Sequence, residues 1–181
     1  MQTSLRELST QLAKQLDDLP DDQAIVDVFD YLAGVVYSLK RLEGVPVWNR
    51  RGERLPGYKK RVSLYLSRIP EGEEPNAYWT SGYFLNSAML RVAACYDRIP
   101  KLLLSPGARK KGNAHSRMES FLGAGTACSN WRNIYCEVNA LKHKRQGLAA
   151  GRRVTRDQVI EALAEIVSTL EERKSQLKTL G

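Results

Sequence analysis

Three polar side chains between Trp131 and Arg145, in the stretch WRNIYCEVNALKHKR, are well suited to chemistry on a phosphate. Arg132, Asn139 and His143 fall on one stripe of a helix, because each helical residue turns by about 100°. An arginine can hold a phosphate, an amide can orient it and an imidazole can carry a proton. These three residues are therefore the candidate catalytic set of a nuclease.

The spacing limits how these side chains can act together. On an ideal helix the axial separation is about 10 Å from Arg132 to Asn139, about 6 Å from Asn139 to His143 and about 16 Å from Arg132 to His143. Arg132 and His143 of one chain cannot easily grip the same phosphate. A symmetric dimer could bring the Arg132 of one copy toward the His143 of the other, and we expect a homodimer.

Helical periodicity dominates the chain, whereas convincing alternating strands are scarce. Ser4 and Glu7 form the pattern of a capping box, which predicts a helix through about Leu16. A broad apolar face predicts a second helix that starts near Asp21 or Asp22 and runs to Leu42. A third helix is expected from Tyr58 to Ile69.

A long apolar helix is expected after Asn76, a good N-cap, and Pro100 should end or kink it. We expect the aromatic residues of this helix to lie in the core rather than to form a platform for bases. They are Tyr78, Trp79, Tyr83, Phe84 and Tyr96. The helix with the candidate site should run from about Thr126 to Lys144. Thr155 and Gln158 form a second capping box and open a final helix whose glutamates, Glu165 among them, lie off its apolar face.

These patterns together predict an all-α fold, a bundle of six or seven helices with short connections. We expect a single domain over residues 1–181, with an N-terminal helix in residues 1–20 and a core in residues 22–175. The packing of such a bundle requires no cofactor.

The formal charge of +8 is unevenly distributed. Residues 1–31 are acidic, whereas residues 101–117 and 142–156 contain basic side chains and no acidic one. Such basic segments predict binding to nucleic acid or another polyanion. Two alternatives stay open: solvated loop charge, or pairing of the acidic N-terminal helices with the basic ones in the fold or a dimer. The candidate nucleic-acid contacts are Asn133, Lys142, Lys144, Arg145, Arg109, Lys110, Lys111, Arg152 and Arg153.

Cysteine and histidine usage argues against a metal centre. Cys95, Cys128 and Cys136 contain no CxxC pair, and His115 and His143 are the two imidazoles of the chain. We therefore expect no metal site and no disulfide framework. The sequence also lacks an apolar run of membrane-spanning length and the pattern of a secretion signal, so a cytoplasmic protein without membrane contact is expected.

The segment RNIYCEVNALKH resembles the motif of the higher eukaryotes and prokaryotes nucleotide-binding (HEPN) family, in which an arginine precedes a histidine on a late helix of a small all-helical domain. FLNSAMLRVAACYDRI also resembles the helix that packs against this motif in bacterial members. The resemblance covers about residues 22–175. It implies an HEPN-like bundle that acts on RNA, as a dimeric, metal-independent ribonuclease with an antitoxin or defence-system partner in toxin–antitoxin or antiphage systems.

The chain departs from the family pattern at one position. Arg132 and Asn133 take the place of the arginine and polar residue of the motif, but Asn139 stands where the histidine belongs. Asparagine forms hydrogen bonds but does not carry protons at neutral pH. Either His143, one turn later, takes over this role, or the protein binds nucleic acid without cutting it.

Simpler roles for the same residues also stay open. Arg132 could form a salt bridge with Glu137 or with the final helix, and His143 could be a solvated residue at a helix end. Three functions are consistent with the sequence: a metal-independent endoribonuclease, a non-enzymatic helical module that binds nucleic acid or a protein, and an interaction subunit whose acidic and basic faces meet in an oligomer.

Overall fold

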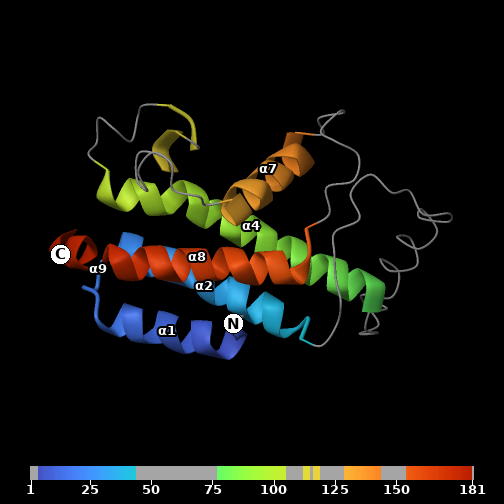
Figure 1. The fold of residues 1–181 in the computed structure, drawn as a ribbon, viewed down its shortest axis with the longest axis horizontal. Helices are drawn as coiled ribbons and strands as arrows, with labels where there is room; N and C mark the ends of the chain where they lie inside the picture. The colour runs from blue at the N-terminus through green and yellow to red at the C-terminus, as the bar shows by residue number, and fades with distance from the viewer. Residues whose placement is uncertain are drawn as a thin grey trace.

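The computed structural model describes residues 4–43, 77–104, 112–114, 116–118, 129–143 and 154–180, and these residues form helices and no strands. The elements are α1 (Leu5–Asp17), α2 (Gln23–Lys40), α4 (Ala77–Leu103), α7 (Ser129–His143), α8 (Arg156–Glu172), α9 (Lys174–Leu177) and the 3₁₀-helix η2 (Lys178–Leu180) (Figure 1). The predicted all-α bundle is confirmed. The expected helix from Tyr58 to Ile69 and the cap at Asn76 lie outside the described residues.

Local capping determines where the helices begin. Ser4 Oγ accepts a hydrogen bond of 3.2 Å from the Glu7 amide, and the Glu7 carboxylate accepts one of 2.7 Å from the Ser4 amide. Thr155 and Gln158 repeat this arrangement at 3.2 and 2.9 Å ahead of α8. The Asp22 side chain caps α2. These three predicted helix starts are confirmed, because a cap depends on residues only three positions apart.

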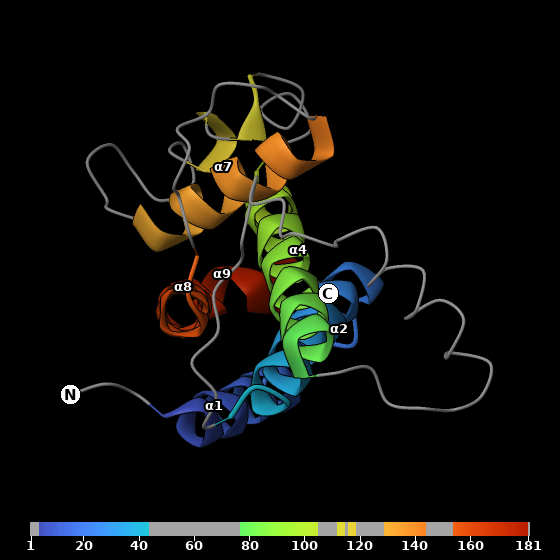
Figure 2. The ribbon, with the colours of Figure 1, turned by 90° about the vertical axis from the view of Figure 1, so that its right-hand side faces the viewer.

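Helix α8 contacts α1, α2, α4 and α7. Helices α2 and α4 pack against each other, and α7 crosses α4 and α8 on the side of the bundle away from α1 (Figures 1 and 2). The shared core is mostly aliphatic, and the described residues contribute three buried aromatic side chains, Phe29, Tyr96 and Trp131. Helix α7 is therefore supported from one side by α4 and α8.

Helix α4 continues through Pro100 to Leu103, so of the two expected outcomes at Pro100, an end or a kink, the end is wrong. A proline within a helix removes one backbone hydrogen bond and costs about 3 kcal/mol. Ile99 and Leu102, on either side, are buried in the core and offset this cost. The amide of Leu104 still donates to the Pro100 carbonyl at 3.0 Å, so the helix ends one turn later than expected.

The aromatic residues of α4 have different environments. Tyr96 is buried as expected, and Phe84 is half-buried against the core. Tyr83 is 67% exposed, so the expectation that it lies in the core is wrong. Tyr83 precedes Phe84 by one residue and is therefore rotated by about 100° around the helix, away from the packed side. The side chains of Tyr78 and Trp79 lie outside the described residues.

No helix in the described part of the chain is long and apolar enough to cross a membrane.

Candidate nucleic-acid interface

Aromatic contacts set the rotation of α7. The indole of Trp131 is fully buried, and its Nε1 donates a hydrogen bond of 2.6 Å to the carbonyl oxygen of Ala162 on α8. Tyr96 on α4 meets Trp131 edge to face, with ring centroids 5.8 Å apart. Tyr96 also stacks on Tyr135 at 4.8 Å. Because the contacts come from two helices, α7 has one defined face toward the bundle and one away from it.

A polar contact anchors the start of α7. Asn130 Nδ2 donates a hydrogen bond of 3.0 Å to Glu165 Oε1 on α8. Burial raises the pKa of Glu165, and the hydrogen bonds from the Asn130 side chain and from the backbone N–H groups of Trp131 and Asn130 offset part of that rise. A carboxylate at this position complements the positive end of the α7 dipole. Glu165 is therefore a packing residue on α8.

Arg132 and Asn139, the two stripe residues whose side chains are described, lie on the side of α7 that faces away from the core. Arg132 and Asn133 are exposed, and Asn139 is half-buried. Ile134 and Val138 are buried, as is Trp131, so the bundle holds the opposite side of the helix. The prediction that Arg132 and Asn139 share one stripe is thus consistent with an exposed Arg132 and a half-buried Asn139.

Arg132 forms no ion pair with any residue in the described ranges, so the alternative in which it pairs with Glu137 is wrong. The two residues are five positions apart, or about 140° around the helix, which places their side chains on different faces. Glu137 is 2% exposed and points into the bundle. The Arg132 guanidinium is therefore at the surface with no acidic neighbour among the described side chains.

The rest of the predicted site is only partly described. His143 is the last residue of α7, and its side chain, like that of Lys142, lies outside the described residues. The remaining candidate contacts lie entirely outside them. These are Lys144, Arg145, Arg109, Lys110, Lys111, Arg152 and Arg153. The structure thus brings Arg132, Asn133 and Asn139 together on one helix.

Some of the basic residues are paired within the fold. Asp97 accepts hydrogen bonds of 2.6 Å from both Lys101 and Arg117. Burial would raise the pKa of Asp97, but these two cations outweigh it and hold the pKa below its usual value. Asp18 at the end of α1 pairs with Lys174 at 2.5 Å. Neither pair joins the acidic N-terminal segment to one of the two basic segments, so that alternative stays a prediction, but Lys101 and Arg117 are engaged within the fold.

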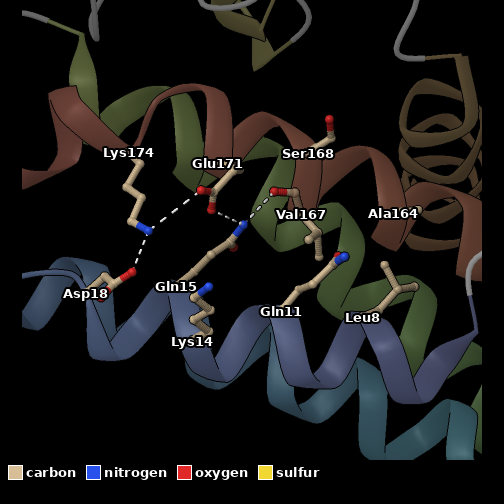
Figure 3. Close-up of a pocket in the computed structure, with 10 residues that line it drawn as sticks. All are labelled: Leu8, Gln11, Lys14, Gln15, Asp18, Ala164, Val167, Ser168, Glu171 and Lys174. Carbon is tan, nitrogen blue, oxygen red and sulfur yellow. Dashed lines mark hydrogen bonds and ion pairs between the residues drawn. The ribbon is translucent and has the colours of Figure 1, made fainter.

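A groove of about 540 Å³ lies between α1 and α8, away from α7 (Figure 3). The side-chain amide of Gln15 is buried there and donates to the Val167 carbonyl at 2.9 Å and to Glu171 at 3.0 Å. Lys174 lies between Asp18 and Glu171. None of the predicted site residues lines this groove. A glutamine on the apolar side of α1, one turn after Leu12, is the sequence signal for this interhelical contact.

The described residues contain no cluster of three or more histidine, cysteine, aspartate or glutamate side chains that could hold a metal ion. Within the described part of the chain, Cys95 and Cys136 form no disulfide. No protein-family model matches this chain, and comparisons with curated proteins and with solved structures find no similar protein.

Proposed function

We propose that this protein is an HEPN-like RNA-binding protein whose contact with the phosphate backbone is the outer stripe of α7. One observation carries the proposal: the Arg132 guanidinium is exposed, lacks an acidic partner among the described residues and shares its stripe with Asn139 on a helix locked by Trp131. An exposed arginine on a rigid helix is suited to a bidentate grip on phosphate. Asn133 and Asn139 add amide donors beside it.

The same stripe supports a cleavage step in a dimer. In this step His143 removes the proton of an RNA 2′-hydroxyl, the 2′-oxygen bonds to the adjacent phosphorus, and the bond from phosphorus to the 5′-oxygen breaks as that oxygen takes a proton from water. Arg132 of the other copy stabilises the phosphorane. The products are a 2′,3′-cyclic phosphate and a 5′-hydroxyl. A metal-independent endoribonuclease of a toxin or defence system is the role that the family resemblance implies.

The matched pair Arg132→Gln and Arg6→Gln tests the binding step. Arg6 is exposed on α1, so both variants remove one surface charge and leave the same shorter, uncharged amide side chain. We expect Arg132→Gln to weaken binding of a single-stranded RNA about ten- to hundredfold, the effect of losing a charge-assisted hydrogen bond. Arg6→Gln should change it little. Equal effects of the two variants would mean that net charge alone determines RNA binding, and this result would overturn the proposal.

Cleavage is tested separately by incubating RNA with the protein in EDTA and measuring 2′,3′-cyclic phosphate ends. We expect His143→Ala to abolish cleavage and to retain binding. If wild-type protein binds RNA but releases no product, the α7 stripe functions as a binding site alone, which is the alternative that Asn139 in the histidine position favours.

A further inference from the structure

A second surface lies where α2 and α4 pack side by side, on their side away from α8 (Figure 2). The two helices run antiparallel, because Tyr31 meets Arg98 and Tyr37 meets Phe84. We call this surface the α2–α4 seam. It consists of Tyr31, Gly34, Tyr37 and Arg41 on α2 and of Tyr83, Arg91 and Arg98 on α4.

Two arginine–tyrosine pairs lie toward the two ends of the seam. Arg98 Cζ lies 4.7 Å from the centre of the Tyr31 ring, and its Nη2 donates to the Tyr31 hydroxyl at 3.2 Å. Arg41 Cζ lies 5.3 Å from the centre of the Tyr37 ring, and its Nη2 donates to the Tyr37 hydroxyl at 3.1 Å. Cation–π contact and the hydrogen bond hold each guanidinium in place. Arg98 and Arg41 are both exposed.

Between these pairs, Arg91 lies directly against Gly34. A Cβ atom at position 34 would come within 2.7 Å of Cδ, Nε and Cζ of Arg91. Only a residue without a side chain therefore leaves the Arg91 guanidinium in this position. Arg91 is half-buried and forms no hydrogen bond or ion pair with the residues that the structure describes. The packing thus places the Arg91 guanidinium in the seam, where none of the described residues accepts a hydrogen bond from it.

Exposed aromatic rings lie beside the arginines. Tyr83 is 67% exposed and Tyr37 is 55% exposed. Both rings contact the half-buried Phe84 edge to face, at centroid distances of 5.4 and 6.4 Å. Phe84 therefore supports two phenol rings at the surface. Neither ring is needed to fill the core, so their positions are available to a ligand.

The charge of the seam indicates which class of ligand it can bind. From Tyr31 to Arg41 the chain contains no acidic residue, and from Tyr83 to Arg98 the one acidic residue is Asp97, whose carboxylate accepts from Lys101 and Arg117. The nearest aspartates of α2, Asp27 and Asp30, lie beyond the Tyr31 end. A surface that combines guanidinium groups with exposed aromatic rings matches single-stranded nucleic acid, since bases stack on such rings and on guanidinium planes while phosphates pair with the cations.

We propose that the α2–α4 seam binds single-stranded RNA without sequence preference, with bases stacked on Tyr37 and Tyr83 and with Arg91 and Arg98 near the phosphates. The inference rests on the proposed function for the class of ligand, but it names a surface separate from α7. From Tyr83 to Arg98 the seam is about 22 Å long. At a rise of about 3.4 Å per stacked nucleotide, this length holds about six nucleotides.

The test uses the full chain and fluorescently labelled oligouridine of 4 to 12 nucleotides, with binding followed by polarisation. Tyr37→Ser combined with Tyr83→Ser should weaken binding at least fivefold, the lower limit for the loss of one stacked base. The matched control is Leu180→Ser, which removes an apolar side chain that is 39% exposed at the C-terminal end. It should bind as the wild type does. Circular dichroism melting of each variant checks that it is folded.

Gly34→Ala gives an independent test, because alanine is favoured over glycine in a helix and the added methyl group should displace Arg91. We expect Gly34→Ala to weaken RNA binding as much as Arg91→Gln does, with no further loss in the double variant. Such non-additivity shows that position 34 acts through Arg91. Full additivity would overturn this role of Arg91.

The outcomes separate the seam from the α7 stripe. Loss of binding in the seam variants supports the seam, whatever Arg132→Gln does. Wild-type affinity in the seam variants, with weakened binding in Arg132→Gln, overturns the seam and leaves the proposed function intact. If only the seam variants lose binding, the α7 interface is overturned. A change in sedimentation mass without a change in RNA affinity identifies the seam as a contact between copies of this chain and overturns RNA binding there.

Discussion

The indole Nε1 of Trp131 lies 2.6 Å from the carbonyl oxygen of Ala162, and this hydrogen bond joins the helix of the candidate site to α8. The indole is fully buried between α4 and α8. The direction in which Arg132 points follows from this contact, because adjacent residues of one helix keep a fixed angle between them.

Trp131→Ala should lower the free energy of unfolding by about 3–5 kcal/mol, the range for removing a large aromatic side chain from a core. Trp131→Phe keeps much of the volume and should cost less. Urea unfolding followed by circular dichroism measures both, and Glu161→Ala on the exposed side of α8 should stay within about 0.5 kcal/mol of the wild type. A Trp131→Ala variant of wild-type stability would contradict the anchoring role.

Glu165→Gln should be at least as stable as the wild type at pH 7. Burial raises the pKa of Glu165 above its ordinary value of 4.5, so the folded state binds more protons than the unfolded state as pH rises from there. The wild type therefore loses stability through that window, whereas the neutral glutamine does not. A glutamine oxygen can still accept from Asn130. Thermal melting at pH 4 and pH 7 measures the difference. The stability of Glu165→Gln relative to the wild type should rise from pH 4 to pH 7, and a fall over this range would contradict the assignment.

Asp97→Asn should show the opposite pH dependence. Lys101 and Arg117 hold the pKa of Asp97 below its ordinary value of 3.8 despite its burial, so the stabilisation is present at neutral pH and is lost as pH falls through the lowered pKa. We expect the variant to be less stable than the wild type at pH 7 and to approach it at low pH. Asp21→Asn, at an exposed position ahead of α2, is the matched control for removal of one aspartate charge. An Asp97→Asn deficit that stays constant down to pH 2 would show that packing, and not charge, is responsible.

Cys95 should resist alkylation in the native protein. Burial raises the pKa of its thiol to about 12, so at pH 8 almost none of it is the reactive thiolate. Iodoacetamide labelling followed by mass spectrometry should leave Cys95 unmodified in the folded state and label it in urea. Rapid labelling of Cys95 without denaturant would mean that the core around α4 opens readily.

Prediction from sequence succeeded where the determining residues are close together in the chain. The capping boxes at Ser4 and Thr155 and the cap at Asp22 each depend on residues within one turn, and all three helices begin as expected. The stripe of Arg132 and Asn139 follows from helical periodicity alone.

Prediction was less successful where a contact depends on the arrangement of helices. Pro100 carries an ordinary helix-breaking signal, but burial of its neighbours offsets that signal. The sequence pattern places Glu165 off the apolar face of its helix, whereas its carboxylate accepts a hydrogen bond from Asn130 on α7. Such pairs become visible only when the helix packing is known.

Gly34 has no side chain to offer a ligand, yet its lack of a Cβ atom is what admits the Arg91 guanidinium between the two helices. An alanine scan limited to charged and aromatic residues would pass over this position. A substitution at Gly34 would therefore change the position of a charged group on this surface while every charged residue stays unchanged.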